Sequence, residues 1–234
     1  YEDFLVPGPD GYLKSYPGNS PENRPLGDFE GAGRISVCVN AAMDFALVKE
    51  LLSNLIEAHS ILGKESQDVS KWEEMLAKVP PYRINEDGAF SEWLHDDFKD
   101  NYRHRHLSHI YPFFPGYEIN RQNNPRLFEA IKTAVRKRLE QGLKSQTGWS
   151  FAHMANIFAR LGDAEKALEC LKLLIRFCTG NNLFTYHNDW RNMGISMIMN
   201  AYGGAPFQID ANLGFTAAVQ ELLLSSGKDY ISLL

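Results

Sequence analysis

The feature that most constrains the fold is the helical spacing of apolar residues over 41–62. A buried stripe along one face of a helix requires apolar side chains at intervals of three and four residues. Asn40 is a suitable N-cap for such a helix, and Gly63 is a suitable residue to end it. The segment therefore predicts a long helix with one buried face. The stripe consists of Leu47, Val48, Leu51, Leu52, Leu55, Ile56 and Leu62.

Further helices follow along the chain. Asn124 before Pro125 is a cap followed by a first-turn proline, which predicts a helix from 125 to about 141. Gly162 and Asp163 form a tight turn between two helical segments, which predicts an antiparallel helical hairpin. The expected helices are 67–78, 125–141, 149–161, 164–178 and 213–225.

The connecting segments favour an all-α protein. Strand signals are sparse, and the best alternation of apolar and polar residues lies at 35–39. Residues 1–36 are rich in Gly and Pro but carry large apolar side chains, which predicts an ordered loop. No repeat of 34–45 residues is evident, and a helical solenoid would have one. We therefore expect an all-α toroid whose long loops build a site at one end.

Composition excludes several classes of partner. The net charge of −5 argues against nucleic acid, because neutralising phosphates requires a basic face. No apolar run approaches the roughly 20 residues of a membrane span.

Cys170 and Cys178 would lie about 12 Å apart on one helix, which is too far for a disulfide bond. We expect these two thiols and Cys38 to be free and buried.

The segment 104–116 has the densest concentration of functional side chains. It holds three of the seven histidines, then runs through aromatic residues to Pro115 and Gly116. Pro112 and Pro115 exclude a regular helix, so we expect a rigid cleft wall with polar tips. Three histidines with a carboxylate could bind zinc, but their spacing matches no known hydrolase motif. Substrate contact is narrowly favoured over structural hydrogen bonding, and no metal is expected. The candidate zinc ligands are His104, His106, His109, Asp96 and Asp97.

Three acidic residues stand in unusual surroundings. Glu22 lies between Pro21 and Asn23, and Glu92 precedes Trp93. Asp210 precedes the last expected helix, where it could equally be an N-cap. Two or more carboxyl groups around one cavity are what glycoside hydrolysis needs, one to protonate the leaving oxygen and one to activate water.

Seven short motifs occur in an order that resembles one enzyme family, glycoside hydrolase family 95. The family comprises inverting 1,2-α-L-fucosidases and some α-L-galactosidases, and the resemblance covers nearly the whole chain. The motifs are Ser20-Pro21-Glu22-Asn23, Glu92-Trp93, the 104–116 segment, Gly148-Trp149-Ser150, Ala159-Arg160-Leu161-Gly162-Asp163, Asn182-Leu183-Phe184 with His187, and Phe207-Gln208-Ile209-Asp210.

The resemblance implies a fold and a pair of catalytic residues. Residues 1–234 would form an incomplete (α/α)6 barrel that is truncated at both ends and lacks the first helices. Glu22 would be the general acid, and burial among Pro21 and nearby aromatic residues would raise its pKa. Asp210 would polarise an asparagine that activates water. That asparagine belongs to an Asn-x-Asn motif that precedes residue 1, so the chain alone is expected to be inactive.

The resemblance also implies substrate contacts, a secreted location, a fucosylated glycan as partner and no cofactor. Two departures from the family pattern stand out: the segment 188–204 resembles longer fungal sequences, and Ala211 and Leu213 replace the commoner Gly and Phe. The tryptophans could equally well pack as stack on a sugar. The expected substrate-binding residues are His104, His106, His109, Glu92, Trp93, Trp149, His187 and Asn212.

Three alternatives remain open. The first is an α-L-galactosidase of the same family, whose substrate differs by one exocyclic hydroxymethyl group. The second is a non-catalytic carbohydrate-binding protein built on the same helices. The third is a zinc hydrolase that uses the histidines of the 104–116 segment.

Overall fold

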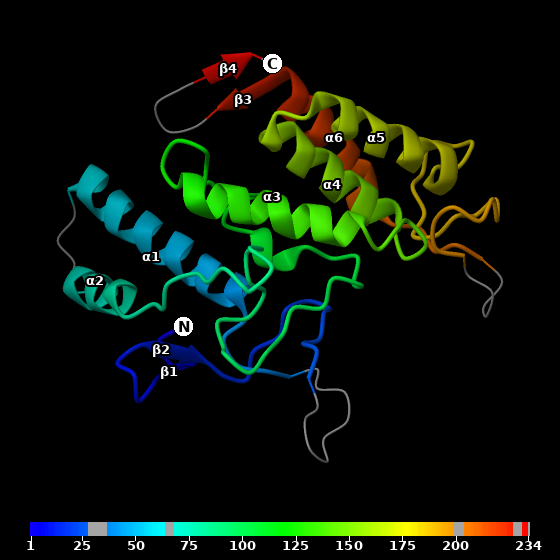
Figure 1. Cartoon of the computed structure of the whole chain (residues 1–234). Coiled ribbons are helices and arrows are strands. Elements are labelled where there is room, and N and C mark those ends of the chain that lie inside the picture. Colours follow the sequence, from blue (N-terminus) through cyan, green and yellow to red (C-terminus); the bar gives the residue numbers. More distant parts are fainter. Residues whose placement is uncertain (28–36, 64–67, 199–203, 227–230, 234) are drawn as a thin grey trace. The chain divides into compact units, whose positions relative to one another are not determined.

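The computed structural model describes residues 1–27, 37–63, 68–198, 204–226 and 231–233. The chain divides into two compact units, residues 1–137 and residues 138–234. Figure 1 shows that helices account for most of the regular structure. The expected all-α class is therefore confirmed.

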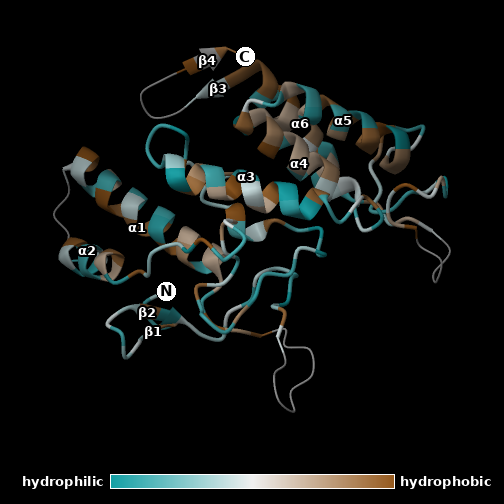
Figure 2. Cartoon of the chain, viewed as in Figure 1, coloured by the Kyte–Doolittle hydropathy of each residue, from teal (hydrophilic) through white to brown (hydrophobic). Residues whose placement is uncertain are grey.

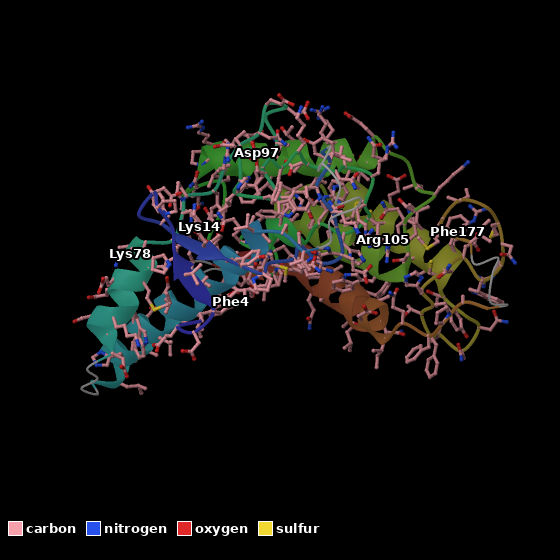
Figure 3. All side chains as sticks on the ribbon, turned by 90° about the horizontal axis from the view of Figure 1, so that it is seen from below. Phe4, Lys14, Lys78, Asp97, Arg105 and Phe177 are labelled. Atoms are coloured by element: carbon pink, nitrogen blue, oxygen red, sulfur yellow. The ribbon has the colours of Figure 1, made fainter. Side chains whose placement is uncertain are left out.

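The first unit opens with a short hairpin instead of the expected irregular loop. Strands β1 (Leu5–Pro7) and β2 (Leu13–Ser15) pair antiparallel, with Leu5 opposite Ser15. Leu5 and Leu13 are buried, which anchors the hairpin to the unit. The Leu13 N–H also donates to the Lys78 carbonyl at 2.8 Å, so β2 lies beside the end of α2 (Figure 3).

Helix α1 (Ala42–Leu62) confirms the first predicted helix. Gly63 ends it in the left-handed conformation, with φ of 59°, as expected. The predicted cap at Asn40 is wrong, because Ala41 is the N-cap and no side chain caps the helix. The Asn40 side chain instead accepts from the Ser15 N–H at 3.1 Å and donates to the Leu94 carbonyl at 3.3 Å. The Asn40 side chain thus links β2 to the segment around Leu94 through hydrogen bonds.

Two further helices of this region match their predictions. Helix α2 covers Val69–Ala77, and α3 covers Pro125–Leu139, two residues shorter than expected. Asn124 caps α3, since its Oδ1 accepts from the Leu127 N–H at 3.2 Å. Between them, a 3-10 turn, η1 (Ser108–Ile110), lies inside the 104–116 segment.

The second unit is built on three packed helices. Helices α4 (Gly148–Leu161), α5 (Ala164–Cys178) and α6 (Ile209–Leu223) lie side by side in Figure 1. Figure 2 shows more hydrophobic colour on α4 and α6 than on α3. The hairpin of α4 and α5 confirms the predicted turn, with Gly162 left-handed at φ of 77°. The buried cluster among the helices consists of Phe151, Ala152, Leu174, Phe177, Cys178 and Ala211.

The start of α6 differs from its prediction. The helix begins at Ile209, four residues earlier than expected, and Gln208 is its N-cap. Asp210 therefore lies in the first helical turn and is not the cap. Gly214 lies within the helix where it crosses α4: a Cβ on Gly214 would lie 2.9 Å from the Ala152 Cβ. After α6, strands β3 (Leu224–Ser226) and β4 (Ile231–Leu233) pair antiparallel.

The predicted strand at 35–39 is only partly within the described residues. Cys38 pairs with Gly18 in an isolated antiparallel bridge, and residues 35 and 36 lie outside the described part. Cys38, Cys170 and Cys178 are free and buried, as expected. Burial raises the pKa of Cys170 and of Cys178 to about 12. No helix in the described part of the chain is long and apolar enough to cross a membrane.

We expect Asp163→Ala to lower the free energy of unfolding by about 0.5–2 kcal/mol. The Asp163 Oδ1 accepts from the Lys166 N–H at 3.1 Å and so caps α5. Asp163→Asn keeps a capping oxygen and should lose much less stability. Urea unfolding of the three proteins measures the difference, and equal stability of Asp163→Ala and the parent protein would contradict the capping role.

Candidate active site

Glu22 projects from a loop whose neighbouring residues are buried. Its side chain is 67% exposed. Ser20, two residues earlier, is fully buried, and Asn23 is 2% exposed. The expected burial of Glu22 among Pro21 and aromatic residues is therefore wrong for this part of the chain. The loop holds the carboxyl group out from a fixed base.

Three side chains from the 104–116 segment gather around Glu22. His104, His106 and Glu22 each present one polar atom within 4.8 Å of the others. The Arg105 Nη2 donates to the Glu22 Oε2 at 3.3 Å, across 83 residues of sequence. Arg105 is labelled in Figure 3. The fold therefore unites the predicted acid with two of the three predicted histidines.

A side chain of the 104–116 segment also bonds to the backbone of the Glu22 loop. The Ser108 hydroxyl donates to the Pro21 carbonyl, directly before Glu22. The rings of His104 and His106 meet edge to face, with centroids 4.8 Å apart. The 104–116 segment thus lies beside the Glu22 loop, and its role as the wall of a cleft there stays a prediction.

Two histidines and a carboxylate are a ligand set that zinc uses. Here the His106 backbone N–H donates to the His104 Nδ1 at 3.2 Å. The Nδ1 lone pair of His104 is therefore engaged in a hydrogen bond. The Arg105 guanidinium also places a positive charge next to Glu22. The chemistry of this cluster favours hydrogen bonding to a neutral ligand over zinc binding.

His109, Glu92 and Trp93 lie in the interior of the first unit. Each is at most 2% exposed. The His109 Nδ1 lies 3.9 Å from the Glu92 Oε2, and the Trp93 Nε1 donates to the Cys38 Sγ at 3.0 Å. The sequence predicts substrate contact for all three residues. Their burial keeps them from a ligand, and Glu92 bonds to Ser20 and Asn23 of the Glu22 loop.

The second unit carries the other predicted site residues. The indole of Trp149 stacks on His153, with ring centroids 5.3 Å apart and planes 9° apart. The backbone N–H of Trp149 donates to the Gln208 Oε1 at 2.6 Å. His187 contacts the Asn188 side chain through Nδ1. Trp149 and His187 are both partly exposed, so each has a surface that a ligand can contact.

Asp210 and Asn212 differ in how their side chains are used. Asp210 is exposed in the first turn of α6, where the helix dipole favours a negative charge. The Asn212 Oδ1 accepts from the Thr185 N–H at 2.9 Å, and its Nδ2 donates to the Leu183 carbonyl at 2.9 Å. Asn212 therefore fixes the 183–185 segment, and its predicted substrate contact stays a prediction.

The aromatic half of the 104–116 segment lines a separate cavity of about 640 Å³. Tyr111, Pro112 and Gly116 face Lys49 and Glu50 of α1 there. The Tyr111 hydroxyl donates to the Glu50 Oε2 at 2.6 Å, and this bond to a carboxylate raises the pKa of Tyr111 to about 12. The segment thus has a histidine face toward Glu22 and an aromatic face toward α1.

Sequence reasoning did not single out Ser20, Asn23 and Arg105 as site residues. Ser20 and Asn23 flank the predicted acid, and Arg105 lies between two predicted histidines. Their position next to predicted site residues is the signal in the sequence that could have identified them. Their roles depend on partners about 70 to 80 residues away, which local patterns do not reveal.

Comparison with known proteins assigns the family. The model of the glycosyl hydrolase family 95 catalytic domain matches residues 1–223. The chain belongs to this family. It is 36% identical to alpha-L-fucosidase 2 of Arabidopsis thaliana over 229 residues, which cover 96% of the chain and 25% of that protein. Two proteins named probable alpha-fucosidase A are 28% identical (Aspergillus niger, 92% of the chain and 25% of that protein) and 29% identical (Aspergillus oryzae, 76% and 24%).

The family 95 assignment agrees with the resemblance carried by the seven motifs. The plant relative is more similar to the chain than the two fungal relatives are. The fungal-type character of segment 188–204 stays a prediction. The chain spans about a quarter of the length of these curated relatives.

Proposed function

We propose that this chain is part of a glycosidase that removes terminal α-1,2-linked L-fucose from glycans with inversion of configuration. The observation that carries the proposal is Glu22, an exposed carboxyl group on a loop anchored by buried side chains, with His104, His106 and Arg105 around it. Family membership and the names of the relatives support fucose as the sugar. An extracellular location and an (α/α)6 barrel for the whole domain are part of the proposal.

In the proposed reaction, Glu22 is the general acid. Its proton passes to the glycosidic oxygen while the bond from that oxygen to the anomeric carbon breaks. Water attacks the anomeric carbon from the opposite face and loses a proton to the base. One water is consumed, and the products are the free alcohol and L-fucose of inverted, β configuration.

Asp210 assists the base in this proposal. An amide is a poor base, so an asparagine that activates water needs a neighbouring carboxylate to polarise it. Asp210 is exposed on a regular helix, so its carboxylate is accessible and its backbone is fixed. The asparagine is the one that the family resemblance places ahead of residue 1.

Recognition of the sugar falls to partly exposed side chains. We assign the imidazole of His104 a hydrogen bond to a hydroxyl group of the sugar. We assign His106 and His187 the same kind of contact. Trp149 offers an indole face to the apolar side of the sugar ring. These residues are rigid recognition groups, and Glu22 performs the proton transfer.

The test is hydrolysis by the full-length gene product, followed by NMR. We expect a disaccharide of L-fucose α-1,2-linked to galactose to release β-L-fucose first, with an α-1,3-linked isomer as a poor substrate. First release of the α-anomer would contradict inversion. Faster cleavage of the matching α-L-galactoside would favour the galactosidase, and binding without cleavage would favour a carbohydrate-binding protein.

A further inference from the structure

We propose that the buried Glu92 is a positioning residue that fixes the loop carrying Glu22. This inference rests on the proposed role of Glu22 as the general acid. It gives Glu92 a task different from the substrate contact that the sequence predicts. Glu92 acts on the reaction through two neighbours of Glu22 and does not touch the sugar.

The two oxygens of Glu92 hold the loop on both sides of Glu22. The Ser20 Oγ donates to the Glu92 Oε1 at 2.7 Å. The Asn23 Nδ2 donates to the Glu92 Oε2 at 2.6 Å. Ser20, Asn23 and Glu92 are each at most 2% exposed, whereas the Glu22 side chain between the two donors is 67% exposed. The loop is therefore fastened at its base by buried bonds, and the exposed Glu22 side chain at its tip pairs with Arg105.

Glu92 is itself held firmly by the first unit. Its carbonyl accepts from the Ala42 N–H at 2.9 Å, at the start of α1. Its N–H donates to the Asp100 Oδ1 at 2.8 Å. The next residue, Trp93, is 1% exposed within a buried apolar cluster. The carboxylate that anchors the Glu22 loop is thus attached to the core of the unit.

The burial of a carboxylate requires a reason. An ionised group removed from water is costly unless hydrogen bonds compensate it, and hydrogen bonds to a charged group are worth more than neutral ones. Glu92 accepts short, strong hydrogen bonds from both Ser20 and Asn23. A neutral residue would hold the same loop less tightly.

Glu92→Gln removes the negative charge without changing the shape of the side chain. With the amide oxygen toward Ser20, the amide N–H₂ faces the Asn23 Nδ2, and two donors repel. With the amide oxygen toward Asn23, the Ser20 hydroxyl has to turn and accept, and both bonds lose the charge that strengthens them. A further constraint stops Asn23 from turning over: its Oδ1 already accepts from the Arg24 N–H at 2.8 Å. We therefore expect the loop to shift and Glu22 to move from its position.

Two substrates that differ in their need for an acid measure this displacement. A fucosylated disaccharide needs a proton on its leaving oxygen, whereas α-L-fucosyl fluoride releases fluoride with little help from an acid. In the full-length gene product, we expect Glu92→Gln to lower kcat on the disaccharide by about 100-fold, the typical effect of a 1 Å misplacement. KM should change little, and kcat on the fluoride should stay near that of the parent enzyme.

Control variants separate positioning from general damage. Val48→Ala removes buried methyl groups from α1, where Val48 is fully buried, and should lower stability without changing the ratio of the two kcat values. Glu73→Gln, at an exposed position on α2, should change neither the stability nor the ratio of the two kcat values. If Glu92→Gln does not fold, Ser20→Ala removes a single bond to Glu92 and should change the ratio in the same direction by a smaller amount.

The outcomes distinguish the two proposals. If Glu92→Gln lowers both kcat values equally, or neither, the positioning role is overturned. If Glu22→Gln also leaves the ratio unchanged, then Glu22 is not the acid and the proposed function falls with it. A changed ratio for Glu22→Gln together with an unchanged ratio for a folded Glu92→Gln would remove the positioning role alone.

Discussion

Replacement of Glu22 by Gln should lower kcat on a fucosylated disaccharide by about 100- to 10,000-fold, the usual contribution of a positioned general acid. Glutamine has nearly the same size and can still pair with Arg105, but its amide has no acidic proton to give. The Glu22 loop is held by buried side chains, so the substitution should leave its backbone in place. Steady-state kinetics on the full-length gene product measures the loss.

Binding separates loss of chemistry from loss of the site. Calorimetry should show that Glu22→Gln binds the intact disaccharide with an affinity close to that of the parent enzyme. Glu129→Gln, at an exposed position on α3, is the matched control and should retain full activity. Undiminished turnover by Glu22→Gln would rule out its role as the acid.

Leu174→Ala should lower the free energy of unfolding by about 2–5 kcal/mol, the range for truncation of a large buried side chain. Leu174 is 1% exposed on α5, in the cluster that joins α5 to α4 and α6. The close crossing at Gly214 leaves little room for the helices to collapse into the cavity. Urea unfolding measures the effect, read from the transition in which the second unit unfolds.

The adjacent residue provides the control. Ile175 is 51% exposed on the same helix, and its side chain has the same size as that of Leu174. Ile175→Ala therefore removes as many carbon atoms as Leu174→Ala. We expect its effect to stay within about 0.5 kcal/mol, as for most surface substitutions. Similar losses for Leu174→Ala and Ile175→Ala would mean that α5 does not bury the face described here.

Local patterns in the sequence predicted the helices well, because helix formation depends on neighbours a few residues away. The helix over 41–62, the cap at Asn124 and the turn at Gly162 formed as expected. The predicted stripe of α1 is buried only in part, since Val48 and Leu52 are buried but Leu51 and Leu62 are 44% and 64% exposed. The predicted cap at Asn40 failed for a non-local reason, because the Asn40 side chain bonds to Ser15 and Leu94. Helix α6 also starts four residues earlier than predicted.

The candidate site shows the same division. Its residue types and their order in the chain are enough to indicate the family and to point to Glu22, His104 and His106. The sequence could not tell which polar residues face a ligand, because burial is decided by distant partners. Glu92 and His109 looked like ligand contacts and are interior residues.

By itself, the sequence determined the helices of this protein, its family and the set of polar residues from which a site could be built. The tertiary structure decided how those residues are used. Glu22 is held out from a loop whose flanking side chains both bond to Glu92, about 70 residues further along the chain. A hydrogen bond is set by distance in space, and only the folded chain brings these groups within reach of one another.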